Sequence, residues 1–163
     1  MPLPFIPGPE TARAFRDALG CFSSGVTVVT TVTPTGPVGV TANSFSSVSI
    51  DPPLILWSVA KATRRYASFF EAERFAVHVL ADNQLDYAKQ FSTFGNPFDR
   101  FDWAPNDDGV PILSDYLALF DCQVAARHDA GDHTIIVGAV LGAMHHPGSA
   151  LIFDQGRYGR FKP

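Results

Sequence analysis

The stretch LALFDCQVAARHDAGDHTIIVGAVLGAMHH, residues 117–146, contains two long segments separated by a tight turn. Both segments, 117–130 and 133–146, are rich in apolar and β-branched residues, and Gly131 and Asp132 lie between them. Two such segments joined by a short turn that contains Gly predict a β-hairpin. Strands that follow one another this closely pair antiparallel, because a parallel pair needs a crossover of a dozen or more residues.

The rest of the chain adds short strands and few helices. We expect strands near 26–33, 38–42, 54–60, 75–80 and 150–155, and helices over 10–22, 64–73 and 83–91. Thr63 and Asp82 are the expected N-caps of the second and third helices, and the Gly-rich and Asn-rich stretch 92–111 is expected to be a long ordered loop. With no regular βαβ alternation, the sequence predicts a mostly β, antiparallel barrel with a few short helices.

The composition suits one domain, spanning residues 1–163, that associates with other copies. Of the 163 residues, 46% are hydrophobic and 17% are charged, and fourteen are Phe. This high share of hydrophobic residues and low share of charged residues favour an oligomer. The net charge is −4 and the basic residues are scattered, so we expect neither nucleic acid nor a membrane as a partner.

The cysteines and the N-terminus indicate the compartment. Cys21 and Cys122 have no spacing that suits a disulfide framework or zinc, and we expect both thiols to be buried. The first ten residues lack the basic and apolar regions of a signal peptide, and the longest apolar run, from Ile135, is about half the length of a membrane span. The sequence therefore predicts a cytoplasmic protein.

The first candidate site is the stretch GVTANSFSSVSIDPP, residues 39–53, which leaves a strand and runs into two prolines. Its hydroxyl and amide side chains can satisfy the local backbone, as in a turn rich in Ser and Thr. Alternatively, residues 41–44 form an edge of donors and acceptors for a flat polar heterocycle, with Ala42 small enough to let a ring approach. Because small barrels have filled interiors, such a ligand would lie outside the barrel or between subunits.

The second candidate site is SVAKATRR, residues 58–65, where a strand leads into a helix. This stretch could form an anion site from Ser58, Lys61, Thr63 and the free amides of the helix N-terminus. Phosphate is the anion expected to bind there. The alternative is a capped helix with solvated basic side chains.

The third candidate is His133, which follows the turn at 130–132 and so lies at a barrel rim. It could equally be an ordinary turn residue. The other four histidines form no metal-binding spacing, so we expect no metal. No nucleophile motif is present either, which argues against covalent catalysis.

Several stretches, in this order, resemble the flavin reductase-like family of FMN-binding split barrels. They are GVTVVTT, GVTANSFSSVSIDPPLILWSV, KATR, FAVHVLADNQ, DRFDW, GDHTIIVG and GRYGRF, and they span about residues 15–161, which leaves 1–9 as an N-terminal extension. The resemblance implies a homodimeric split β-barrel in which NADH or NADPH reduces FMN or FAD. It also implies that the reduced flavin goes to a separate monooxygenase component.

The resemblance also implies roles for particular residues. Residues 41–44 would line the flavin ring, and Ser58, Lys61 and Thr63 would surround its phosphate end, where Ala62 departs from the small hydroxyl residue usual in the family. His133 would orient the nicotinamide. The expected site residues are Thr41, Ala42, Asn43, Ser44, Ser58, Lys61, Ala62, Thr63, Lys89, Phe91, His133, Arg157 and Tyr158.

Three functions remain open from the sequence. The first is an NAD(P)H:flavin oxidoreductase that treats flavin as a substrate or exchangeable cofactor. The second is an enzyme with tightly held FMN that passes electrons to another acceptor. The third is a flavin-binding protein without turnover.

Overall fold

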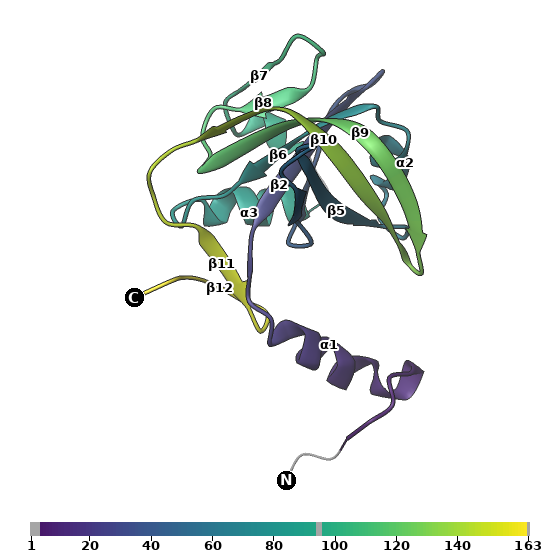
Figure 1. The fold of residues 1–163 in the computed structure, drawn as a ribbon. Coiled ribbons are helices and arrows are strands. Elements are labelled where there is room, and N and C mark those ends of the chain that lie inside the picture. The colour runs from purple at the N-terminus through teal and green to yellow at the C-terminus, as the bar shows by residue number, and fades with distance from the viewer. Residues whose placement is uncertain (1–3, 94–95, 163) are drawn as a thin grey trace.

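The computed structural model describes residues 4–93 and 96–162, so the first three residues of the expected N-terminal extension lie outside the described chain. Its main element is a seven-stranded antiparallel sheet in the order β3-β2-β6-β9-β10-β5-β4, curled around a core (Figure 1). The strands are β2 Thr27–Thr33, β3 Gly36–Ala42, β4 Ser46–Ser49, β5 Leu54–Ala60, β6 Arg74–Val79, β9 Ala118–Ala130 and β10 His133–His145. This confirms the mostly β, antiparallel expectation.

The long hairpin at the centre of the sheet is β9 and β10, which pair from His133 opposite Ala130 to His145 opposite Ala118. Strand alternation sends every second side chain of β5 and of the first half of β10 inward, and these residues are buried. The core inside the barrel gathers Val29, Ile55, Trp57, Val59, Phe69, Phe75, Val77, Cys122 and Ile136.

The barrel is split between its edge strands β3 and β4. A pair of hydrogen bonds bridges the split, since the Ser58 backbone N–H donates to the Ser44 hydroxyl (2.9 Å) and that hydroxyl donates to the Ser58 carbonyl (3.1 Å). The segment that connects β3 to β4 is therefore fixed to β5. This segment is the polar stretch of the first candidate site.

A second core lies outside the barrel, under helix α3 (Leu85–Ser92) and the loop that follows it. The Phe91 ring is buried there and packs edge-on against Phe98 at 5.2 Å. A Cβ on Gly39 would lie 2.5 Å from this ring, so only glycine lets α3 approach β3 so closely. The Thr41 hydroxyl adds a 2.6 Å hydrogen bond to the Ala88 carbonyl. Helix α3 thus fixes the end of β3.

A three-stranded sheet stands beside the barrel. It pairs β1 (Ser24–Gly25), β11 (Leu151–Asp154) and β12 (Arg157–Arg160) in the order β1-β11-β12. Near its tip, the Gln155 N–H donates to the Gly20 carbonyl at the end of α1 (Ala12–Gly20). The helix itself extends away from the barrel (Figure 1) and exposes Phe15, Leu19 and nearby Phe22.

Several local expectations were wrong. Thr63 does not cap the second helix, because a turn intervenes before α2 (Tyr66–Phe70), and Asp82 does not cap α3, whose N-cap is Gln84. No element was expected in the tail GRYGRF, and it contains a strand, β12. The described part of the loop 92–111 contains the 3-10 helix η2 (Pro97–Asp99), β7 (Trp103–Pro105) and the first residue of β8 (Pro111–Leu113).

The two cysteines also differ from one another. Cys122 is buried in the barrel core as expected, but Cys21 is exposed, because α1 does not fold back on the barrel. Within residues 4–93 and 96–162, no helix is both long and apolar enough to cross a membrane.

Candidate functional site

The first hollow lies at the split of the barrel, where the end of β3 meets β5 and the start of β10. Its volume is about 200 Å³. It is lined by Val40, Thr41, Ala42, Asn43, Ser44, Trp57, Ser58, Val59, Ala60, Thr63 and His133. The structure thus brings together seven of the expected site residues, taken from all three candidate stretches.

The hydroxyl groups of residues 41–44 are already engaged. Thr41 donates to the Ala88 carbonyl and Ser44 bridges to Ser58, so both satisfy backbone groups, as the turn interpretation predicted. Asn43 is exposed and its side chain makes no hydrogen bond to any other described residue. The groups left for a ligand are the Asn43 amide and the backbone of this segment, beside the small side chains of Ala42 and Ala60.

His133 lies at the rim of the first hollow, with 44% of its side chain exposed. Its Nδ1 lies 2.7 Å from the Asp132 carboxylate. This hydrogen bond and the nearby imidazole lower the pKa of Asp132, so the carboxylate is ionised over the neutral range and accepts an N–H from the ring. With Nδ1 engaged in this way, Nε2 is the ring nitrogen left for a ligand.

The expected phosphate residues are only partly assembled. Ser58 and Thr63 line the first hollow, whereas Lys61 and the exposed Ala62 do not. The Lys61 ammonium bonds to the Asp129 carboxylate and to the Gly131 carbonyl, and the Asp129 hydrogen bond raises the pKa of Lys61. The lysine is therefore charged but held at the neighbouring hairpin turn.

A second hollow, of about 190 Å³, adjoins the first and shares Thr41, Ala42 and Asn43 with it. Tyr158 of β12 closes its far side, with its ring 5.1 Å from that of Phe153. The hollow is lined by Val26, Thr41, Ala42, Asn43, Ser92, Phe153 and Tyr158. Sequence reasoning missed Val26, Ser92 and Phe153, which lie far apart in the chain and outside the three candidate stretches.

Besides Lys61 and Ala62, three further expected residues line neither hollow. Phe91 is fully buried against Gly39, so its ring supports the end of β3 from behind. Lys89 is exposed on the last turn of α3. Arg157 lies on the opposite face of β12 from Tyr158, because neighbouring strand residues point to opposite faces.

The described residues hold no cluster of three or more His, Cys, Asp or Glu that could bind a metal ion. Burial raises the pKa of the Cys122 thiol to about 12, so it is no thiolate nucleophile. What the first two hollows offer is shape and hydrogen-bonding groups. Shape and hydrogen-bonding groups are what a protein supplies to an organic cofactor that carries out the chemistry itself.

Comparison with known sequences identifies the family. A family model described as "Flavin reductase like domain" matches residues 19–162. The chain belongs to this family. FMN reductase (NADH) SmoA of Agrobacterium fabrum is 55% identical over 157 residues, which cover 96% of this chain and 90% of SmoA. HsaB of Mycobacterium tuberculosis, a reductase subunit of a flavin-dependent monooxygenase, is 39% identical over 93% of this chain and 83% of HsaB.

Solved structures agree with this assignment. NADH:FAD oxidoreductase SgcE6 of Streptomyces globisporus C-1027, in complex with NAD and FAD fragments, superposes with a TM-score of 0.89 at 36% identity and 98% coverage of both chains. An oxidoreductase structure from Sinorhizobium meliloti 1021 gives 0.88 at 43% identity and 97% coverage of this chain, which spans only 54% of that longer one. The fold is therefore the split barrel of flavin reductases, as the sequence resemblance implied.

Proposed function

We propose that this chain uses NADH or NADPH to reduce FMN or FAD by hydride transfer. The observation that carries the proposal is the first hollow, where Asn43 and the backbone of 41–44 meet His133 across small side chains. The names of SmoA and SgcE6, which specify NADH together with FMN or FAD, support the same reaction.

A bound flavin supplies the redox chemistry, since its ring accepts a hydride from the nicotinamide. The chain holds and orients the two rings. We assign Asn43 and the backbone of 41–44 to the polar edge of the flavin, where donors stabilise the charge that develops on reduction. The first hollow, of about 200 Å³, is smaller than the roughly 300 to 1,000 Å³ typical of ligand pockets, so its lining encloses only part of a flavin.

We assign the phosphate end of the flavin to Ser58 and Thr63 at the wall of the first hollow. Lys61 joins them if it exchanges the Asp129 carboxylate for phosphate. Because riboflavin lacks the phosphate, FMN should bind more tightly than riboflavin. Equal affinity for the two flavins would remove these residues from the phosphate role.

We propose further that the reduced flavin leaves for a separate monooxygenase. HsaB, named as the reductase subunit of a flavin-dependent monooxygenase, supports this role. The first hollow encloses only part of a flavin, which also suits a flavin that exchanges. A tightly held FMN acting on another acceptor is the alternative, and it predicts that flavin stays bound through gel filtration.

The test is steady-state NADH oxidation at 340 nm by purified protein, with no flavin, riboflavin, FMN or FAD added. We expect rapid, saturable oxidation that depends on added flavin, with a lower KM for FMN than for riboflavin. Flavin binding without oxidation of either nicotinamide would overturn the reductase assignment and leave a binding protein.

We propose a homodimer as the working form. Apolar side chains are exposed on several elements of the single chain, and burying such a surface is what drives association. They are Ile6, Phe15, Leu19 and Phe22 near α1, Val48 and Ile50 near β4, and Leu141 and Met144 on β10. Light scattering should give close to twice the 17.6 kDa chain mass. A strictly monomeric protein that still binds flavin tightly would contradict the dimer.

A further inference from the structure

Lys61 lies in the chain between two residues that line the first hollow, yet its ammonium group is held outside that hollow. Ala60 and Thr63 both line it, and the Thr63 N–H donates to the Ala60 carbonyl at 3.2 Å, so Lys61 is at the corner of the turn between them. The ammonium bonds instead to the Asp129 carboxylate and, at 2.7 Å, to the Gly131 carbonyl. The turn between β9 and β10 therefore holds this cation beside the proposed flavin site.

The hairpin turn is closed without the side chain of Lys61. The two strands pair up to the turn, where His133 lies opposite Ala130. The Lys61 backbone N–H also donates to the Asp132 carbonyl at 2.9 Å. These backbone contacts do not depend on where the ammonium group lies, so the side chain can leave the turn while the turn keeps its shape.

The ion pair between Lys61 and Asp129 is open to solvent. The exposed fraction is 38% for the Lys61 side chain and 81% for that of Asp129. A pair this exposed adds little to stability, because water screens the charges and two mobile side chains must be held in place. The flexible four-carbon stem of lysine lets the ammonium turn to another anion. The pair is thus strong enough to compete with a ligand but too weak to exclude one.

The turn offers a second carboxylate, but that one is already engaged. Asp132 accepts a hydrogen bond from His133, with 2.7 Å between Oδ1 and Nδ1. Asp129 is therefore the carboxylate that holds the ammonium of Lys61. A phosphate that approached this lysine would have to displace Asp129.

We propose that Asp129 sets the flavin affinity of the site by competing with the flavin phosphate for Lys61. Before binding, the ammonium contacts Asp129, and after binding it contacts phosphate, so the energy of the ion pair is subtracted from that of the phosphate contact. The competition weakens the binding of FMN but not of riboflavin, which has no phosphate. Weaker binding suits a flavin that leaves after reduction. This inference rests on the proposed function, and within it on Lys61 as a phosphate ligand.

The key variant is Asp129→Asn, which removes the charge and keeps the shape of the side chain. It should lower the Kd of FMN about two- to fivefold, the range expected for the loss of an exposed ion pair, and leave the Kd of riboflavin unchanged. Flavin fluorescence titration measures both constants without turnover. The difference between Asp129→Asn and the wild type should shrink as salt is added, because ions screen exposed charges.

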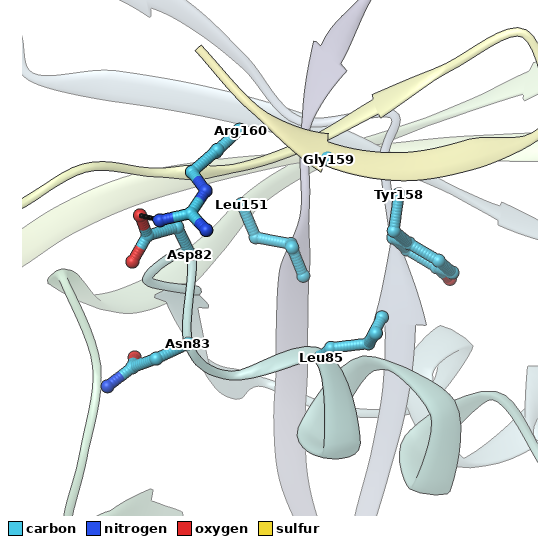
Figure 2. Close-up of a pocket in the computed structure, with 7 residues that line it drawn as sticks. All are labelled: Asp82, Asn83, Leu85, Leu151, Tyr158, Gly159 and Arg160. Carbon is cyan, nitrogen blue, oxygen red and sulfur yellow. Dashed lines mark ion pairs between the residues drawn. The ribbon is translucent and has the colours of Figure 1, made fainter. Parts of the chain in front are cut away.

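The matched control is Asp82→Asn, which removes the carboxylate of another ion pair. Arg160 Nη1 lies 3.9 Å from Asp82 Oδ2 at the rim of a third hollow, between β12 and the start of α3 (Figure 2). Neither residue belongs to the described lining of the first hollow. Both variants change the net charge of the chain by the same amount. A general loss of repulsion towards phosphate would therefore lower the Kd of FMN equally in both.

The variant Lys61→Gln tests whether Asp129 acts through the lysine. In the Lys61→Gln background, Asp129→Asn should gain no more FMN affinity than Asp82→Asn does. A gain as large as in the wild-type background would overturn the competition, because Asp129 would then repel phosphate directly. The proposal is also overturned if Asp129→Asn leaves the Kd of FMN unchanged, or changes the Kd of riboflavin as much as that of FMN.

The titration needs no NADH, which separates this inference from the proposed reaction. A gain in FMN affinity that requires both Lys61 and the phosphate would support the competition even if the chain oxidised no NADH. An active reductase in which Asp129→Asn behaves like Asp82→Asn would remove the competition and leave the proposed reaction intact.

Discussion

Replacing His133 by alanine is expected to lower kcat/KM for NADH about 100-fold, the loss that a misplaced reactant ring produces. The flavin Kd should stay unchanged. The reason is the position of the imidazole at the rim of the first hollow, where Nδ1 is held by Asp132 and Nε2 is left for a ligand. Steady-state kinetics at 340 nm and flavin fluorescence titration measure the two quantities separately.

The matched control is His145→Ala, the same change at the far, exposed end of β10. It should leave both quantities as they are. Asp132→Asn should cost less than His133→Ala, since the amide can still accept a hydrogen bond but no longer carries the charge that favours it. A wild-type kcat/KM for NADH in His133→Ala would show that this residue has no role in hydride transfer. Weaker flavin binding in the variant would show that His133 contacts the flavin rather than the nicotinamide.

The antiparallel barrel could be predicted because most of its strands can be recognised from their local sequence. The hairpin β9 and β10, and the strands β2, β3 and β5, are rich in β-branched residues and bounded by turn residues, so local sequence and tertiary structure agree. Strand β12 carries no such signal. Its four residues, Arg157–Arg160, are exposed and include a glycine, and they become a strand only by pairing with β11.

The candidate site was predictable only in part, because some of its residues are brought together by tertiary contacts that leave no local pattern in the sequence. Residues 41–44 and Ser58 come together because the segment that follows β3 is hydrogen-bonded to β5 through Ser44 and Ser58, a contact that the sequence alone does not indicate. For Phe91 the helical period carried the correct information, because Ala88 and Phe91 are three residues apart on the buried face of α3. The family resemblance also implies that this ring lies near the flavin, which stays a prediction.

His78 sets a limit on stability in acid that the sequence did not reveal. It is fully buried on β6, where Nδ1 lies 3.1 Å from the Val28 carbonyl and the Leu113 N–H donates to Nε2 at 3.1 Å. The carbonyl can only accept, so the proton is on Nδ1 and the ring is neutral. A second proton on Nε2 would face the Leu113 N–H. Burial accordingly lowers the pKa of His78 to about 4.

The unfolded chain therefore binds a proton at His78 below pH of about 6.5, while the folded chain resists it until about pH 4. Stability from this group is complete above the unfolded pKa and is lost as the pH falls towards 4. The loss in unfolding free energy reaches about 3 kcal/mol, at about 1.4 kcal/mol per pKa unit. Urea unfolding at a series of pH values between 7 and 4 measures it.

The expected result is that His78→Asn is less stable than the wild type at pH 7, because the Leu113 N–H loses its partner, but has a flatter pH profile. The control His128→Asn removes an exposed histidine and should keep the wild-type slope. The effect should extend to function, since His78 pairs with Val28 and Val28 pairs with Thr41 across the sheet. If the wild type and His78→Asn lose stability in parallel as pH falls, another group is responsible for the acid sensitivity.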